Sequence, residues 1–338
     1  MKNIVQEWLQ VRPAGLYCVP GDFHIDPVRK VDRAVITHGH SDHARPGHAH
    51  VLATAETHAV NRIRLGKRAG RHLQTMAYDE VLTLGGLKVW LVPAGHILGS
   101  AQVVMEYQGA RAIVSGDYKR GPDPTCVPFD AVRCDVFVTE ATFGRPVYRH
   151  PDPLREASRL RRSLELFPDQ CHLVNAYGLG KSQRMIGLLR QVGWTEPVFV
   201  HGAMVDICHA YKHFGVDLGD VRPLSEASPD DLTGQVVLAP PGATQGLTDQ
   251  IVREARTAFA SGWMRLRKRA TTAGVDLPLI ISDHADWPEL TRTLVDTAAE
   301  EVWITHGEET DLINYCKAQG IRGRKLSDLA IDKVRKAG

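Results

Sequence analysis

The segment Thr37–His43 reads THGHSDH and contains the pattern H-x-H-x-D-H, formed by His38, His40, Asp42 and His43. An isolated histidine is usually a surface residue or a hydrogen-bonded core residue, but four ligand-type residues at this spacing favour a metal site. Imidazole and carboxylate groups suit zinc, and manganese or iron are alternatives. Such a loop can present His38 and His40 on one side and Asp42 with His43 on the other, and thereby serve two metal ions.

Further ligand-type residues follow short apolar runs later in the chain: His96 after WLVPAG, Asp117 after AIVSG, and His306 after VWIT. The run VFVT leads in the same way into Glu140. Enzymes of the α/β class place their chemistry on loops at the ends of buried strands. His96, Asp117 and His306 are therefore candidates for the further ligands that a two-metal centre would need, although each alone would be weak evidence.

The elements that must position these residues are predicted as strands over much of residues 16–140. Apolar runs rich in β-branched residues lie there between turn residues, which favours strands over helices. They are RAVIT, HVLAT, LKVWLVPA, AQVVMEY, ARAIVSGD and CDVFVTEA. Three prolines within Phe143–Pro153 then indicate a domain boundary near residue 145, before the amphipathic segment LREASRLRRSLELF.

Beyond this boundary the pattern indicates a small α/β unit. The predicted strands CHLVNAY, PVFVHG and QVVLAP alternate with predicted helices at KSQRMIGLLRQVG (181–193) and TDQIVREARTAFASG (248–262). From residue 278, PLIISDH and then EEVWITHGE repeat the strand-into-histidine arrangement of the first section. The chain is therefore expected to return to its first domain after an inserted one.

Composition sets broad limits on the function. The 338 residues are enough for one large domain or two ordinary ones, and 43% of them are hydrophobic. The 41 Lys and Arg residues nearly balance the 39 Asp and Glu residues, so the overall charge does not indicate a nucleic-acid partner. Six cysteines without a C-x-x-C pair, and no apolar run of signal-peptide or membrane-spanning length, predict a soluble cytoplasmic protein without a membrane partner.

Taken together, H-x-H-x-D-H, GHILGS, SGD and the late HG resemble the motifs of the metallo-β-lactamase superfamily, over most of residues 16–140 and 278–310. The further segments TEATFG, NAYGLGKSQRM, SGWM, ISDHADW and THGE resemble the β-CASP nucleic-acid hydrolases, most closely their bacterial DNA-ligase-associated exonucleases. The resemblance implies an α/β fold, a metallo-β-lactamase αββα sandwich built from residues 1–144 and 276–338. It also implies an inserted α/β β-CASP domain over residues 145–275.

The resemblance also implies roles for individual residues. Two divalent metal ions, zinc or manganese, are expected as cofactors, with Asp42 and Asp117 counted among the catalytic residues. Asp26 matches a position where the superfamily keeps an acidic residue beneath the metals, which orients a ligand histidine. His284 is expected to act as general acid or phosphate donor, with Glu140 orienting it and raising its pKa. The first metal is assigned to His38, His40 and His96, the second to Asp42, His43 and His306, and Asp117 is expected to bridge them.

The segment GLGKS (178–182) is not a P-loop, because Asn175 stands where that motif requires glycine. It precedes an amphipathic helix, so Lys181 and Ser182 are candidates to receive a substrate phosphate at the helix N-terminus. A tightly packed glycine-rich turn is an equally weighted alternative. His201 is a further candidate substrate contact.

The segment SGWMRLRKRA (261–270) concentrates four positive charges close to Trp263. Trp263 and Arg265 are therefore candidates for base stacking and phosphate contact. The alternative is a solvated helix face, which is the commoner reason for such a run.

The first functional hypothesis is a metal-dependent DNA exonuclease that acts in repair beside a DNA ligase, with DNA as its partner. The second keeps the mechanism but takes RNA, because His306 is more typical of the RNA-processing members of the family. A small-ester hydrolase is a third hypothesis, which leaves the insertion and ISDHADW unexplained. A scaffold protein without catalysis is a fourth, and the complete set of ligand positions argues against it.

Overall fold

The computed structural model describes residues 4–243 and 255–334, which belong to two compact units. The sandwich unit contains the chain up to Pro122, then Cys126–Tyr148, and the part from His284 onward. The inserted unit contains Asp123–Thr125 and Arg149–Asp283. The predicted bounds of the inserted domain were 145–275, and this domain assignment stays a prediction.

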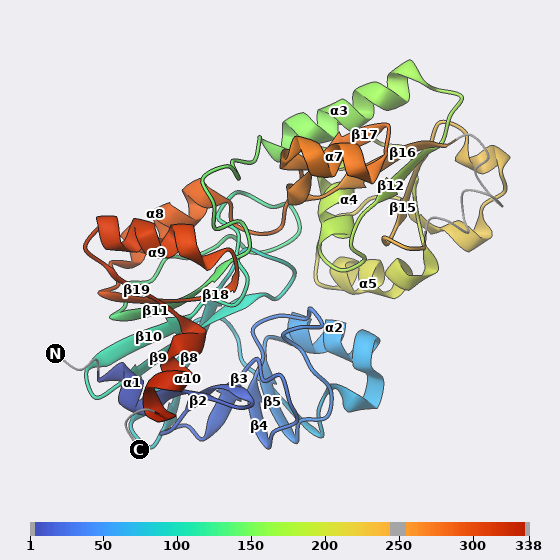
Figure 1. The fold of residues 1–338 in the computed structure, drawn as a ribbon. Helices are drawn as coiled ribbons and strands as arrows, with labels where there is room; N and C mark the ends of the chain where they lie inside the picture. Colours follow the sequence, from blue (N-terminus) through green and yellow to red (C-terminus); the bar gives the residue numbers. More distant parts are fainter. Residues whose placement is uncertain (1–3, 244–254, 335–338) are drawn as a thin grey trace. The chain divides into compact units, whose positions relative to one another are not determined.

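The sandwich unit contains two sheets of β-strands (Figure 1). The first sheet has the strand order β1-β2-β3-β4-β5-β6, and its strands from β3 onward pair in parallel. The strands are β1 (Leu9–Arg12), β2 (Gly15–Cys18), β3 (Phe23–Ile25), β4 (Arg33–Val35), β5 (His50–Ala53) and β6 (His72–Thr75).

The second sheet has the order β19-β18-β11-β10-β9-β8-β7 and joins the two ends of the sequence in one layer. Strands β10, β11, β18 and β19 pair in parallel, so β18 from the C-terminal part lies directly beside β11. The strands are β7 (Leu82–Leu84), β8 (Leu87–Pro93), β9 (Ala101–Tyr107), β10 (Ala110–Val114), β11 (Val136–Ala141), β18 (Glu301–Gly307) and β19 (Arg322–Lys325).

The core of the sandwich unit follows from alternation along these strands. In β11, Val136 and Val138 enter the core between the two sheets, whereas Phe137 belongs to the core under the outer helices. Because both faces of the second sheet are covered, its strands read as continuous apolar runs. The predicted αββα sandwich is confirmed. Its helices are α1 (Val5–Trp8), α2 (Ala55–Leu65), the 3-10 turn η1 (Gly66–Ala69), α8 (Trp287–Thr297), α9 (Glu309–Ala318) and α10 (Leu326–Val334).

The inserted unit is a separate α/β layer arrangement with one parallel sheet of order β14-β13-β15-β12-β16-β17 (Figure 1). Its strands are β12 (His172–Asn175), β13 (Val198–Val200), β14 (Val221–Pro223), β15 (Val236–Ala239), β16 (Arg256–Ala260) and β17 (Leu277–Leu279). Its helices are α3 (Pro153–Leu166), α4 (Lys181–Gln191), α5 (Gly202–His213) and α7 (Arg267–Ala273), with 3-10 turns η2 (Leu224–Glu226), η3 (Asp230–Leu232) and η4 (Gly262–Arg265). No helix in the described ranges is both long and apolar enough to cross a membrane.

One predicted element is wrong. The segment 248–262 was expected to be a helix, and its first part, 248–254, lies outside the described residues. The part that is described contains strand β16, which pairs with β12 and with β17. Helix-favouring residues such as Arg256 and Ala258 misled the prediction, because parallel pairing on both sides and burial of Ala258 and Ala260 outweigh local propensity here.

Candidate metal centre

The ligand loop, Thr37–His43, begins where the buried strand β4 ends. The backbone N–H of Ile36 still donates to Leu52 O at 2.9 Å, and His38, two residues later, is fully buried. The loop then turns tightly, since the N–H of Ala44 donates to His40 O at 2.8 Å. The turn brings the histidines of the motif to one point at the end of the first sheet.

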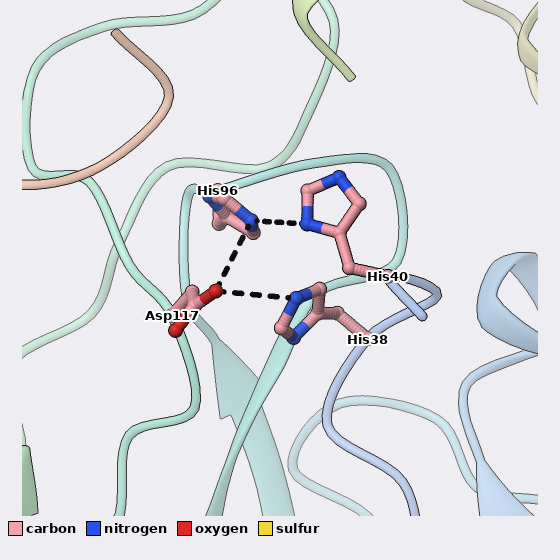
Figure 2. Close-up of side chains that lie close together, drawn as sticks. All are labelled: His38, His40, His96 and Asp117. Atoms are coloured by element: carbon pink, nitrogen blue, oxygen red, sulfur yellow. Dashed lines mark hydrogen bonds and ion pairs between the residues drawn. The ribbon is translucent and has the colours of Figure 1, made fainter. Parts of the chain in front are cut away.

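Four ligand atoms form a first compact group, shown in Figure 2. The Asp117 Oδ2 atom lies 3.5 Å from His38 Nε2 and 3.8 Å from His96 Nε2. His96 Nε2 lies 3.0 Å from His40 Nδ1. The ligand atoms of these four residues all lie within 4.8 Å of one another, although they come from three separate loops.

His96 and Asp117 follow β8 and β10 in the second sheet. The Ser100 hydroxyl accepts from His96 N at 3.0 Å and thereby fixes the turn GHILGS. Gly116, just before Asp117, has φ +56, and a Cβ there would lie 2.7 Å from Thr37 Oγ1. Only glycine allows this close approach of the Asp117 loop to the ligand loop.

A second compact group contains His43, Asp117 and His306. Asp117 Oδ2 lies 3.4 Å from His43 Nε2, and the rings of His43 and His306 are 5.0 Å apart. His306 occupies a β-bulge, because Glu140 pairs with Thr305 whereas the next residue of β11 pairs with Gly307. Its φ of +51 is uncommon for a residue other than glycine, and the bulge redirects its side chain toward the site.

Asp42 is the predicted ligand that the structure does not bring into either group. Its side chain is 61% exposed, and its Oδ2 lies 3.8 Å from His43 Nε2. Residues that are adjacent in a turn, such as Asp42 and His43, can point their side chains in different directions. The assignment of Asp42 to the second metal therefore stays a prediction.

Asp26 supports His43 from below. Its Oδ2 lies 2.7 Å from His43 Nδ1 and accepts from Thr37 Oγ1 at 2.6 Å, while its Oδ1 accepts from Thr37 N at 2.8 Å. This contact leaves His43 Nε2 facing Asp117. The arrangement suits a carboxylate that orients a ligand histidine, and this role of Asp26 stays a prediction.

A third group links Glu140 and His284 with Asp117. His284 Nδ1 lies 3.0 and 3.1 Å from the two oxygens of Glu140, which is 1% exposed at the end of β11. The backbone N–H of Tyr118 also donates to Glu140 Oε1 at 2.8 Å. His284 Nδ1 lies 4.0 Å from Asp117 Oδ2, and its ring centroid is 4.7 Å from that of His96.

Burial and charge set the protonation of the ligands. Burial lowers the pKa of His38 well below its usual range, and His43 adds to this effect. For His43 burial also favours the neutral form, but the Asp117 and Asp26 carboxylates outweigh it and hold the pKa well above its usual range. For Asp117 burial favours the acid, but His43 outweighs it and holds the pKa well below its usual range.

The donor atoms fit a divalent cation. Among the described residues, His38 Nε2 and His43 Nε2 are buried without a hydrogen-bond partner, and both face Asp117 Oδ2. Buried polar atoms of this kind require a partner, and imidazole nitrogens around a carboxylate match the preferences of zinc and similar metals. A cation also requires deprotonated ligands, so its binding would release the proton that the two carboxylates favour on His43.

The chain is similar to proteins with names from DNA and RNA metabolism. It is 28% identical over 320 residues to a "Probable DNA ligase" of Opitutus terrae, covering 94% of this chain and 30% of that protein. It is 23% identical over 403 residues to the "Cleavage and polyadenylation specificity factor subunit 3-I" of Arabidopsis thaliana, covering 92% and 56%. "Endoribonuclease ysh1" of Emericella nidulans is 28% identical over 130 residues, covering 37% and 14%.

These similarities agree with the motifs and with the two-sheet fold. In its motifs, its two-sheet fold and these relatives, the chain resembles the β-CASP branch of the metallo-β-lactamase superfamily. A solved structure of a protein of unknown function from Enterococcus faecalis V583 has the same fold, with a TM-score of 0.56 and 13% identity over 81% of this chain and 75% of that one. No family model matches the sequence. The chain spans 30% of the DNA ligase and 56% of the plant protein, and so corresponds to a part of each.

The candidates for phosphate contact on α4 are buried. Lys181 is 4% exposed, and its Nζ lies 2.5 Å from Asp283 Oδ1. Ser182 is fully buried, and its hydroxyl donates to Tyr177 O at 2.8 Å. Both side chains are thus engaged within the inserted unit, and their role as substrate contacts stays a prediction.

The other candidate contacts lie at the surface of the inserted unit. The Arg269 guanidinium lies 4.5 Å from the ring centroid of the half-buried Trp263. Arg265 is exposed and donates to Arg149 O at 3.1 Å. His201 caps α5, because its Nδ1 accepts from Ala203 N at 3.2 Å, which gives it a structural partner.

Sequence reasoning did not single out Thr37, Tyr118 or Asp283. Thr37 directly precedes His38, and its backbone N–H donates to Asp26. Tyr118 directly follows Asp117, and its backbone N–H donates to Glu140. Asp283 directly precedes His284 in ISDHADW, and this adjacency was the available signal. Its partner Lys181 is 102 residues away in sequence, and only the fold brings the two together.

Proposed function

We propose that this chain is a two-metal-dependent DNA exonuclease that hydrolyses phosphodiester bonds and acts with a DNA ligase in repair. One observation carries the proposal. Asp117 Oδ2 lies within 4.0 Å of nitrogens from His38, His43, His96 and His284, at 3.5, 3.4, 3.8 and 4.0 Å. A carboxylate shared by ligand histidines and by a candidate proton donor suits hydrolysis at a phosphate.

The residues that would hold two zinc or manganese ions follow from the two compact groups and from the family resemblance. When bound, such ions make hydroxide available near neutral pH and neutralise charge that develops on the phosphate. Asp26 orients His43, and Ser100 fixes the turn that carries His96. The ligands would be His38, His40 and His96 for one ion, Asp42, His43 and His306 for the other, and Asp117 for both.

The Glu140–His284 pair supplies the proton in this proposal. Glu140 accepts from His284 Nδ1, so the tautomer is fixed and Nε2 is the position from which a proton passes to the departing 3′-oxygen. The Tyr118 N–H holds Glu140 in place. After transfer the imidazole is neutral and regains a proton from solvent, to which His284 is 21% exposed at its side chain.

The exposed segment Arg265–Arg269 is proposed to contact the substrate backbone. Arg265, Arg267 and Arg269 are exposed on η4 and α7. Trp263 beside Arg269 provides an aromatic face next to these positive charges. Positive charge with an aromatic ring is the combination that binds single-stranded nucleic acid without sequence preference.

DNA is favoured because the identity to the DNA ligase is 28%, against 23% for the plant cleavage and polyadenylation factor, at almost equal coverage of this chain. RNA is the second candidate, since other similar proteins are named as an endoribonuclease and a cleavage and polyadenylation factor. His306 also favours RNA, as noted above. A small-ester hydrolase leaves the Glu140–His284 pair and the inserted unit without a purpose.

The test is a cleavage assay with purified protein and either zinc or manganese. The substrates are 5′-labelled and 3′-labelled DNA, single- and double-stranded, together with RNA of the same sequence. We expect progressive shortening of DNA from an end. Cleavage of RNA without DNA would replace the first candidate by the second, and hydrolysis of small esters alone would overturn both.

A further inference from the structure

The segment Pro278–Asp283 leads directly to His284 and is held at several points by polar contacts within the inserted unit. The backbone N–H of Ile280 donates to Glu156 Oε2 at 2.8 Å, and Glu156 is 4% exposed on α3. Arg159, one turn later on the same helix, donates to Pro278 O at 3.2 Å. Helix α3 therefore fixes the beginning of this segment.

Helix α4 fixes the end of the segment. Lys181 Nζ lies 2.5 Å from Asp283 Oδ1, and the two side chains are 5% and 4% exposed. Arg184, which is 2% exposed, donates through its Nη1 to Ser282 O. The last two residues before His284 are thus held, one through its side chain and one through its carbonyl group.

The same helix holds the short segment Asp123–Thr125, which follows Asp117 in the chain. Arg184 forms an ion pair with Asp123, and both side chains are 2% exposed. A Cβ at Gly187 would lie 2.7 Å from Pro124 Cγ, so a glycine is needed for this close packing on α4. The N-terminal half of α4 therefore anchors two chain segments, one after a candidate metal ligand and one before His284.

We propose that Lys181 and Arg184 are positioning residues for His284, acting through Asp283 and Ser282. The proposal rests on the proposed function, because it assigns these residues to the proton-transfer step of that reaction. A proton donor has to stay within hydrogen-bond reach of the departing oxygen, and its efficiency depends on that geometry. Buried charges are held in one arrangement only while each keeps its partner, which makes the Lys181–Asp283 pair a strict constraint on the backbone.

In this proposal Lys181 does not contact the substrate. A lysine that contacts a phosphate is accessible, whereas Lys181 is 4% exposed and its ammonium is on Asp283. Loss of a substrate contact raises KM, whereas loss of a positioning contact lowers kcat on substrates that need the proton. A merely stabilising contact changes the folded fraction and leaves the rate per folded molecule unchanged.

The test compares two substrates that differ in their leaving group. In an oligonucleotide the leaving group is a 3′-alkoxide, which needs a proton. In the p-nitrophenyl ester of thymidine 5′-phosphate the leaving group is p-nitrophenolate, which is stable without one. We expect Lys181→Met to lower kcat on the oligonucleotide by about 10- to 100-fold, part of the effect of general acid catalysis. Its KM, its metal content and its rate on the p-nitrophenyl ester should stay close to those of the parent protein.

Arg190→Met is the matched control. Arg190 is on the same helix and donates to Leu218 O at 3.0 Å and to Trp194 O at 2.9 Å, remote from Asp283. We expect it to reduce stability without a dependence on the leaving group. If Lys181→Met does not fold, Lys181→Met combined with Asp283→Leu removes both charges and leaves none buried alone, and the same leaving-group dependence is expected.

Equal slowing of both substrates, the same pattern in Arg190→Met, or loss of metal would overturn the positioning role. His284→Ala separates this failure from failure of the proposed function. If the loss of rate in His284→Ala depends on the leaving group and the loss in Lys181→Met does not, only the positioning role is wrong. If His284→Ala acts like the parent on the oligonucleotide, or the parent cleaves no nucleic acid, the proposed function fails as well.

Discussion

The ligand loop and the Glu140–His284 pair lie at one site but are built in different ways. The ligand loop places its histidines within one tight turn after β4 and buries His38 and His43 around Asp117. Glu140 and His284 come from positions 144 residues apart and meet as one carboxylate–imidazole contact. The first region is a cluster of donor atoms that fits a cation, whereas the second is a contact between one carboxylate and one imidazole.

This difference implies a division of labour. Removal of a ligand leaves buried polar atoms without a partner, so metal affinity and activity should fall together. His284 is partly exposed and lies at the edge of the candidate metal cluster, with its Nδ1 atom 4.0 Å from Asp117 Oδ2. Its removal therefore leaves the ligand atoms of the cluster in place. Rate should then fall without loss of metal, and the following predictions test this contrast.

Asp117→Ala should have the largest effect, because both metal groups share this carboxylate. We expect no bound metal by elemental analysis and no detectable cleavage of labelled DNA. Asp32→Ala is the control, since Asp32 is a 71% exposed aspartate of the same unit that contacts Arg33 and His50 instead. Metal retained at the parent level in Asp117→Ala would remove Asp117 from the ligand set.

His284→Ala should slow cleavage of an oligonucleotide by about 10²- to 10⁴-fold, the usual range for a general acid. Single-turnover kinetics measures this step directly, without interference from product release. Glu140→Gln should slow the same step less, because the amide still contacts Nδ1 but carries no charge. A parent-like single-turnover rate in His284→Ala would show that the proton comes from another group.

Asp26→Asn should weaken metal binding by about 10- to 100-fold, as is typical when the partner of a ligand histidine is changed. The substitution keeps the size of the side chain but removes the charge that faces His43 Nδ1. Competition with a chelator measures the affinity. An unchanged affinity would mean that Thr37 and the backbone orient His43 without Asp26.

Arg269→Ala should have the smallest effect, a lower affinity for single-stranded DNA and a salt dependence reduced by about one unit of slope. Catalysis at saturating substrate should not change. Arg222→Ala is the matched control, because Arg222 is also an exposed arginine of the inserted unit but pairs with Asp220. Titrations at several salt concentrations measure both, and equal slopes in the two variants would remove the basic segment from the binding surface.

Much of the fold was accessible from the sequence, because strands covered on both faces read as apolar runs. The ligand loop was equally accessible, since its spacing is local. The strand Arg256–Ala260 was missed, because its sequence favours a helix and only parallel neighbours make it a strand. The αββα sandwich was inferred from motif resemblance rather than from periodicity alone.

The sequence predicted which residues belong to the candidate site but not where their side chains point. Asp42 lies within the motif, yet its carboxylate is largely exposed. His306 is redirected by a bulge that depends on how β18 pairs with β11, which no local pattern encodes. The contact of Lys181 with Asp283 depends on how α4 packs in the inserted unit. The sequence alone therefore left a phosphate contact and a tightly packed turn as equal alternatives for Lys181.

The metal content of purified His284→Ala tests the division of labour most directly. Elemental analysis of this variant and the parent protein, prepared side by side with the same metal, gives the comparison in one measurement. We predict equal metal per chain in a variant whose cleavage is slow. Loss of metal from His284→Ala would contradict the account, because it would make His284 a ligand rather than the proton donor.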